Sequence, residues 1–145
     1  MKQIILVMGL SGAGKSTLAL ALLGALADRY KSVFILNADQ VRGEADDWDF
    51  SKEGRIRQAH RMYNAAMIYS VDYDYVICDL IAPYEEMRKI IDPGYTIWVN
   101  TIKKSRFEDT DLIFTPPVDP DFMIIEQDAT KWAEVIACSI LDNRQ

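Results

Sequence analysis

The stretch GLSGAGKST, residues 9–17, decides the fold of this chain. It fits the pattern G-x-x-x-x-G-K-[ST] without a mismatch, and it lies between an apolar run at residues 3–8 and an Ala- and Leu-rich segment at residues 15–30. Glycines in such a loop permit positive φ angles, and successive N–H groups at the start of the following helix point at a bound anion. The stretch therefore predicts a cradle for a nucleoside triphosphate, which we take to be ATP with Mg²⁺.

Different residues of this loop would contact different parts of the bound nucleotide and its metal ion. Lys15 would bring a positive charge to the β- and γ-phosphates, and the hydroxyl of Ser16 would be a ligand of Mg²⁺. We expect the following residues to hold the triphosphate: Gly9, Ser11, Gly12, Ala13, Gly14, Lys15, Ser16 and Thr17. The loop leaves open whether the γ-phosphate passes to water, to a nucleotide or to another acceptor.

Short apolar runs alternate with helical patterns along the rest of the chain. We expect strands at residues 3–8, 32–36, 74–81, 95–99 and 122–125, and helices at residues 15–30, 51–71, 83–91 and 129–141. Ser51 is the expected N-cap of its helix, Pro83 lies in the first turn of the next, and residues 101–120 read as a loop. The alternation predicts an α/β protein with a three-layer P-loop NTPase fold, a five-stranded parallel sheet with helices on both faces, in a single domain at residues 1–145.

Composition narrows the possible partners. The 145 residues carry a net charge of −6, so the broad basic surface of a nucleic-acid-binding protein is not expected. Cys78 and Cys138 both stand in apolar surroundings and are predicted to be buried free thiols, which favours a reducing, cytoplasmic compartment. The apolar run at residues 4–8 is too short for a membrane span. We expect a small-molecule nucleotide substrate and no contact with nucleic acid or membrane; the oligomeric state stays open, with a homodimer as one alternative.

Two acids follow buried strands. In LNADQVRG, residues 36–43, Asp39 could accept the proton of an acceptor hydroxyl or orient water around Mg²⁺, and Arg42 could hold an anionic group. The alternative is an ordinary charged turn with Arg42 in solvent. Asp79, at the end of VICDL, could help to hold Mg²⁺ through water, or could instead cap the helix after Pro83.

Further stretches follow in a characteristic order: WDFSKEGRIRQAHR at residues 48–61, DLIAPYEEMR at 79–88 and RFEDTDLIFTPPVDPDFMI at 106–124. Taken with GLSGAGKST and LNADQVRG, they resemble the adenylylsulfate kinase family, whose members phosphorylate the 3′-hydroxyl of adenosine 5′-phosphosulfate. The resemblance implies that Lys15 and Asp39 are catalytic, with Asp39 at the transferring phosphoryl group.

The resemblance also implies a substrate site. Arg42 and Arg55 would hold the phosphosulfate, and Phe50 and Phe107 would sandwich the adenine, unless these two rings simply pack in the core. The implied substrate-binding set is Asp39, Arg42, Phe50, Arg55, Gln58, Ile81, Pro83 and Phe107, and the expected metal-site residues are Ser16, Asp39 and Asp79.

The chain departs from the family around residues 100–109. The family's lid helix is missing between Asn100 and Phe107, so the basic residues there are either a reduced lid or a solvated loop. Glu108 and Asp109 replace the family's Thr and Gly. Two alternatives therefore stay open: a P-loop kinase for another nucleotide or small hydroxyl acceptor, and a nucleotide-binding module without kinase activity. The acidic residues 44–49 read as a solvated loop.

Overall fold

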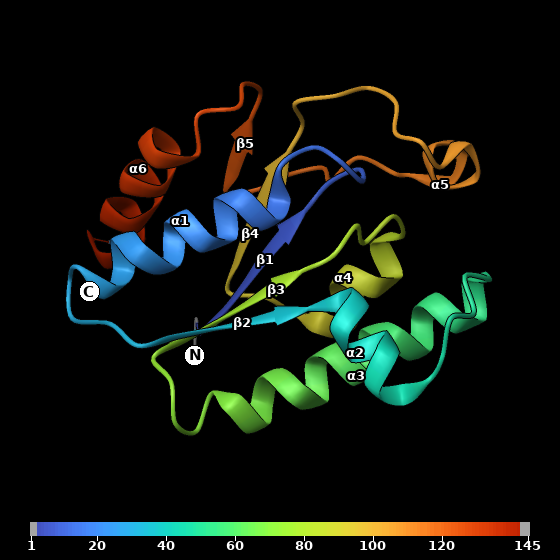
Figure 1. Cartoon of the computed structure of the whole chain (residues 1–145), viewed down its shortest axis with the longest axis horizontal. Coiled ribbons are helices and arrows are strands. Elements are labelled where there is room, and N and C mark those ends of the chain that lie inside the picture. Colours follow the sequence, from blue (N-terminus) through green and yellow to red (C-terminus); the bar gives the residue numbers. More distant parts are fainter. Residues whose placement is uncertain (1–2, 143–145) are drawn as a thin grey trace.

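The computed structural model describes residues 3–142 and contains one parallel sheet covered by helices (Figure 1). The strands are β1 (Ile4–Met8), β2 (Val33–Asn37), β3 (Tyr75–Asp79), β4 (Tyr95–Val99) and β5 (Phe122–Ile124). The helices are α1 (Lys15–Ala27), α2 (Ala38–Ala45), α3 (Lys52–Tyr69), α4 (Glu85–Ile91), α5 (Glu108–Ile113) and α6 (Ala129–Asp142). The strand order is β2-β3-β1-β4-β5 and every neighbouring pair is parallel, which confirms the predicted α/β fold.

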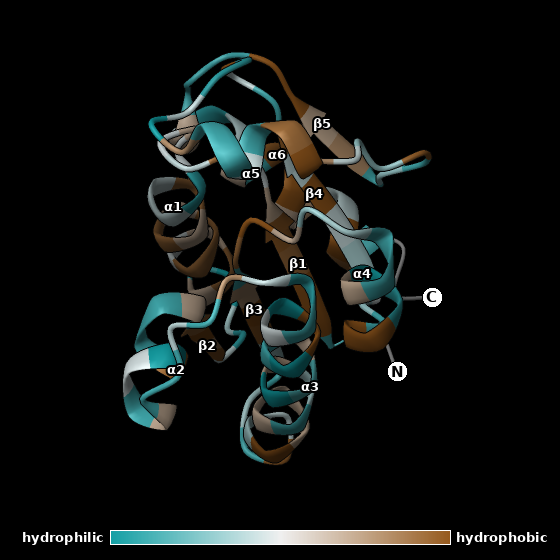
Figure 2. Ribbon diagram, turned by 90° about the vertical axis from the view of Figure 1, so that its right-hand side faces the viewer, coloured by the Kyte–Doolittle hydropathy of each residue, from teal (hydrophilic) through white to brown (hydrophobic). Residues whose placement is uncertain are grey.

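The sheet separates two hydrophobic layers. Its central strands are themselves hydrophobic and appear brown in Figure 2. Because side chains alternate along a strand, Ile5 and Val7 of β1 pack toward α1 and α6, whereas Leu6 and Met8 pack toward α3 and α4. Burial on both faces explains why β1 reads as a continuous apolar run. Within residues 3–142, no helix has both the length and the apolarity to cross a membrane.

The stretch after β2 is a helix with a buried Arg42, so the alternative of an ordinary charged turn with Arg42 in solvent is wrong. Asn37 is the N-cap of α2, and its side chain accepts a hydrogen bond of 3.1 Å from the backbone N–H of Gln40. Asp39 consequently stands in the first turn of α2, where the positive end of the helix dipole favours a carboxylate.

Two expected boundaries also differ. Pro83 lies before α4 and not in its first turn, because its carbonyl accepts hydrogen bonds from the backbone N–H of Thr115 at 2.9 Å and from Arg88 at 3.3 Å. The predicted loop at residues 101–120 contains α5, which begins after Phe107. Ser105 precedes α5 and is tied to Asp111 through both its backbone N–H and its hydroxyl, at 2.9 and 2.6 Å.

The prediction of two buried thiols is wrong for one of them. Cys78 on β3 is buried, but Cys138 on α6 is exposed. The buried face of α6 is formed by Ala133, Ile136, Ala137 and Ile140, so Cys138 falls on the outer side of the helix. Its sulfur accepts a hydrogen bond from Arg29 at 3.2 Å.

Candidate active site

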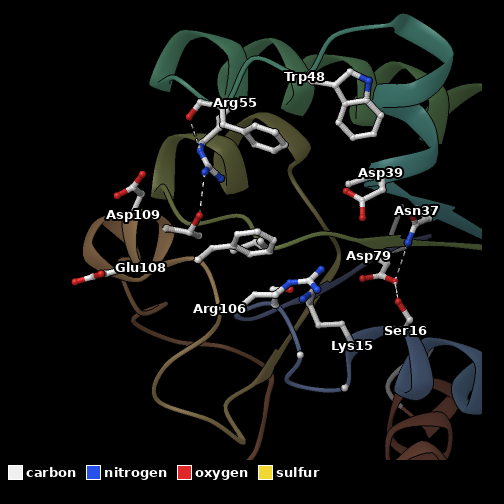
Figure 3. A pocket seen from close by; sticks show the side chains of 18 of the residues that line it. Lys15, Ser16, Asn37, Asp39, Trp48, Arg55, Asp79, Arg106, Glu108 and Asp109 are labelled. Carbon is white, nitrogen blue, oxygen red and sulfur yellow. Dashed lines mark hydrogen bonds between the residues drawn. The ribbon is translucent and has the colours of Figure 1, made fainter.

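A large cavity opens at the carboxyl ends of β1, β2 and β3, where ligands bind in open parallel sheets (Figure 3). Its volume is about 1060 Å³. Its wall is made of Ser11, Gly12, Gly14, Lys15, Ser16, Thr17, Asn37, Ala38, Asp39, Trp48, Phe50, Arg55, Asp79, Ile81, Arg106, Phe107, Glu108, Asp109 and Thr110. Residues from distant parts of the sequence therefore meet around one space.

The phosphate-binding loop is held in a conformation that requires glycine. Gly9 has a φ of 152°, and a Cβ on it would lie 2.4 Å from the carbonyl oxygen of Val99, so no other residue fits there. The carbonyl of Ala13 accepts hydrogen bonds from the Thr101 hydroxyl at 2.6 Å and from Gln127 Nε2 at 3.3 Å. The loop is thus fixed from the segment after β4 and from the segment between β5 and α6.

Lys15 lies in surroundings that suit a cation that binds an anion. Its Nζ donates a hydrogen bond of 3.0 Å to the carbonyl of Leu10. Burial lowers the pKa of Lys15, and the carboxylates of Asp79 and Asp39 oppose that shift. The ammonium group is therefore half-buried and lies near two carboxylates of the same cavity.

A row of hydrogen bonds joins the ends of β2 and β3 to the start of α1. Asn37 and Asp79 are register partners, so their side chains lie side by side on one face of the sheet. Asp79 Oδ2 accepts hydrogen bonds from Ser16 Oγ at 2.7 Å and from Asn37 Nδ2 at 3.3 Å (Figure 3). The alternative in which Asp79 caps the next helix is wrong, because Tyr84 is the N-cap residue of α4 and no side chain caps that helix.

Arg42 and Arg55 both support the loop that presents Phe50. Arg42 is buried, donates from Nη1 to the carbonyls of Asp47 and Asp49 at 3.1 Å each, and has its guanidinium carbon 4.4 Å from the centre of the Phe50 ring. Arg55 donates from Nε to the Phe50 carbonyl at 2.9 Å and from Nη2 to Thr110 at 3.1 Å. The backbone of residues 47–50 is thus held on two arginines.

The acidic stretch is also more structured than a solvated loop. Asp47 pairs with Arg57 at 3.2 Å and with Arg61, and Arg57 also pairs with Asp49 at 2.8 Å. The hydrogen bonds from Arg57 and from the backbone of Asp49 lower the pKa of Asp47 to about 2. These ion pairs tie residues 47–50 to α3.

The structure brings most predicted site residues to the cavity, but not all. Phe50 and Phe107 are 52% and 45% exposed, so core packing does not account for either ring. Five predicted residues stand behind the wall or beside it: Gly9, Ala13, Arg42, Gln58 and Pro83. Gln58 is buried and donates to the Ala38 carbonyl at 2.9 Å, which fastens α2 to α3. Arg42 is buried behind the Phe50 ring and does not line the cavity.

The sequence did not predict several residues of the cavity wall. Asn37 could have been found, because Asn before a short polar segment is a common helix N-cap. Thr110 had no signal of its own, since nothing in the pattern shows that residues 106–110 turn back toward the cavity. Arg106 was one of the basic residues for which a reduced lid and a solvated loop both stayed open, and it lines the cavity.

A second hollow of about 330 Å³ lies against the other side of the phosphate-binding loop and shares Gly12, Gly14 and Thr17 with the cavity. Trp132 lines it. Within residues 3–142, the indole Nε1–H of Trp132 is the buried side-chain polar atom without a hydrogen-bond partner. The phosphate-binding loop therefore lies between the larger cavity, which is lined by charged residues, and a smaller hollow that contains the unpaired Trp132 N–H.

The glycine loop between β1 and α1, the Ser16–Asp79 contact and the parallel strand order together define the class of P-loop kinases. Within that class the chain belongs to the adenylylsulphate kinase family, whose model matches residues 1–102.

Comparison with known proteins shows how far the similarity extends. The adenylyl-sulfate kinase of Pseudomonas entomophila is 38% identical over 84 residues, which is 57% of this chain and 40% of that protein. The chain's matched segment spans less than half the length of the curated relatives.

Two solved structures of APS kinase from Mycobacterium tuberculosis share the fold. The Cys556Ala mutant has a TM-score of 0.79 at 21% identity, covering 97% of this chain and 96% of the other. The complex with AMPPNP and APS has a TM-score of 0.74 at 17% identity and covers 97% of each chain. The fold is therefore similar over nearly the whole chain, although the family model ends at residue 102.

Proposed function

We propose that this chain is an ATP-dependent kinase that transfers the γ-phosphate of ATP to the 3′-hydroxyl of adenosine 5′-phosphosulfate. The observation that carries the proposal is one shared cavity, in which Lys15, Ser16 and Asp39 face the exposed rings of Phe50 and Phe107. The name of the Pseudomonas relative and the complex of the Mycobacterium enzyme with AMPPNP and APS support the same reaction.

The nucleotide half of the site follows from the loop. The triphosphate of ATP would lie on the backbone N–H groups of residues 9–17 with Lys15 at the β- and γ-phosphates. The second hollow, beside Gly12 and Gly14, would take the ATP base, which offers acceptors for the free N–H of Trp132. Ser16 would bind Mg²⁺ directly and Asp79 through water, and the ion would neutralise charge on the phosphate oxygens.

The chemical step would rest on positioning and charge. Asp39 would accept the proton of the 3′-hydroxyl as its oxygen attacks the γ-phosphorus, while Lys15 stabilises the negative charge on the transferring group. Figure 3 shows the carboxylate of Asp39 directed into the cavity, on the same side as Asp79. No covalent intermediate with the protein is required.

The acceptor half would use aromatic stacking. Phe50 and Phe107 would hold the adenine, and Arg55, on the wall beside them, would face the phosphosulfate. Arg42 would act mainly by holding the loop of Phe50 in place. Glu108 and Asp109 point away from Lys15 and Arg106, so they lie at a distance from the phosphates (Figure 3).

A second candidate is a kinase of the same class for another nucleotide or a small hydroxyl compound. Two observations favour it: Glu108 and Asp109 are part of the cavity wall, and this wall lies beyond the part of the chain that the family model matches. Carboxylates would suit an acceptor with hydroxyl or amino groups better than a dianion.

A coupled assay of ADP release separates the two candidates. Adenosine 5′-phosphosulfate and a panel of nucleosides, nucleotides and small alcohols are compared at equal concentrations, with Lys15→Ala as the inactive control. We expect turnover with adenosine 5′-phosphosulfate, and formation of 3′-phosphoadenosine 5′-phosphosulfate by chromatography. Turnover with another acceptor alone would replace the first candidate by the second. We further propose that the protein acts in the cytoplasm; a homodimer stays a prediction.

A further inference from the structure

Arg106 is a cationic wall residue whose charged group is uncommitted. Arg42 donates from Nη1 to two backbone carbonyls, and Arg55 donates from Nε and Nη2 to the Phe50 carbonyl and Thr110. Lys15 donates to the Leu10 carbonyl. Within the part of the chain that the structure describes, the guanidinium of Arg106 has no hydrogen bond or ion pair, and its recorded contact is with the Phe107 ring, 4.8 Å from the centroid. A planar fork of donors is therefore available to an oxyanion.

The direction of this side chain matters as much as its availability. Figure 3 shows Arg106 and Lys15 extending toward the same part of the cavity, with Asp39, Asp79 and Ser16 beyond them. Both side chains belong to the cavity wall, and a polyanion bound between them would be attracted to both positive charges. We therefore expect the phosphates to lie in this part of the cavity.

The backbone on both sides of Arg106 is anchored. On one side, Ile102 packs against the core and Thr101 bonds to the phosphate-binding loop. On the other, Ser105 bonds to Asp111, and its hydroxyl accepts a hydrogen bond of 3.0 Å from the N–H of Phe107. Lys103, Lys104 and Arg106 are all exposed, but of these three only Arg106 lines the cavity. The anchored backbone therefore holds Arg106 at the cavity wall.

We propose that Arg106 is a catalytic residue that stabilises the phosphoryl group during transfer. Its N–H groups would donate to the oxygens of the γ-phosphoryl group while the bond to the β-phosphate oxygen breaks and the bond to the acceptor oxygen forms; the acceptor's proton passes to Asp39. The inference rests on the proposed phosphoryl transfer from ATP, but not on which acceptor is used. A short, ordered segment would then do what a mobile lid does in other kinases of this class.

The variants for the test are Arg106→Ala, Arg106→Lys and, as matched control, Lys104→Ala. Steady-state kinetics give kcat and both KM values, and calorimetry gives the Kd for ATP. For Arg106→Ala we expect a loss of kcat of about a hundredfold to a thousandfold, as for removal of a donor to a transition-state oxyanion, with the Kd for ATP changed less than about threefold. Arg106→Lys recovers part of the loss, and Lys104→Ala leaves kcat and KM unchanged.

A second measurement does not depend on the acceptor. ADP, Mg²⁺ and aluminium fluoride mimic the phosphoryl group in flight, and we expect the fluoride complex to tighten ADP binding in the wild type and in Lys104→Ala but not in Arg106→Ala. Retained tightening in Arg106→Ala overturns the proposal, and so does a rise in acceptor KM with an unchanged kcat, which would make Arg106 an acceptor-binding residue. If the wild type does not use adenosine 5′-phosphosulfate, the proposed acceptor is wrong, but the fluoride measurement still decides the role of Arg106.

Discussion

Replacing Gly54 by Ala tests whether the loop of Phe50 is held as tightly as the structure indicates. Gly54 lies in the first turn of α3, and a Cβ on it would stand 2.2 Å from the carbonyl oxygen of Asp49 and 2.6 Å from its Cγ. Non-bonded carbon and oxygen atoms stay more than about 3 Å apart in packed interiors, so Asp49 must move by about 1 Å. That movement disturbs the hydrogen bonds of Asp49 with Arg42, Ser51 and Arg57.

The expected energies have opposite signs. Alanine in place of glycine within a helix contributes about 1 kcal/mol of stability, whereas overpacking costs about 1–3 kcal/mol and each disturbed hydrogen bond about 1 kcal/mol. With three hydrogen bonds disturbed, we expect Gly54→Ala to lower the free energy of unfolding by about 3–5 kcal/mol, with a fall in Tm of about 2–4 °C per kcal/mol. Gly24→Ala is the matched control: a Cβ there meets nothing within 4 Å, so it should stabilise α1 by about 0.5–1 kcal/mol.

The functional readout separates the two halves of the cavity. Because Asp49 precedes Phe50, its displacement should raise the KM for the acceptor about tenfold or more and leave the Kd for ATP within about twofold, since the phosphate-binding loop is not touched. Chemical denaturation and acceptor titrations of both variants measure this. A Gly54→Ala protein as stable as Gly24→Ala, with an unchanged acceptor KM, would refute the reasoning.

Three more predictions concern single groups. Asp39→Asn should lower kcat by about a hundredfold or more while ATP binds normally by calorimetry, and an equal kcat would remove Asp39 from the proposed mechanism. Asp79→Asn removes a carboxylate that raises the pKa of Lys15, so Lys15 should lose its proton at a lower pH. ATP affinity, measured from pH 7 to 10, should therefore begin to decline at a lower pH in the variant than in the wild type. Identical pH curves for the two proteins would contradict this prediction. Cys138 should react with a thiol reagent in the native protein, whereas Cys78, whose pKa burial raises to about 12, should react only in denaturant; mass spectrometry of labelled peptides distinguishes them.

The sequence predicted those parts of the fold that repeat a local pattern. Strand β1 is a continuous apolar run because it is buried on both faces. The glycine loop has a fixed residue spacing because its backbone N–H groups must surround a phosphate. The helix after β2 was missed because Asn37 and Asp39 are of residue types that favour turns and helix starts alike. In the structure, the hydrogen bond from the Gln40 N–H to the Asn37 side chain marks the start of a helix.

The sequence predicted which charged residues belong to the site, but not which of them line the cavity and which lie behind its wall. Arg42 and Arg55 look alike in sequence, yet one lies behind Phe50 and the other on the wall. Nothing local distinguishes them, because the difference arises where residues 47–50 fold back over α2. Arg106 likewise owes its place to anchors at Thr101 and Ser105, whose partners are distant in sequence or belong to an unpredicted helix.

Asn37 joins the two halves of the site through one amide group. Its Oδ1 caps α2, which carries Asp39, and its Nδ2 binds the carboxylate that Ser16 also contacts. A nucleotide that changes how Asp79 is engaged therefore acts directly on the start of α2, on the acceptor side. Such coupling is reciprocal: the factor by which the nucleotide alters acceptor affinity equals the factor by which the acceptor alters nucleotide affinity. Communication between the two proposed substrates would thus pass through the ends of two neighbouring strands.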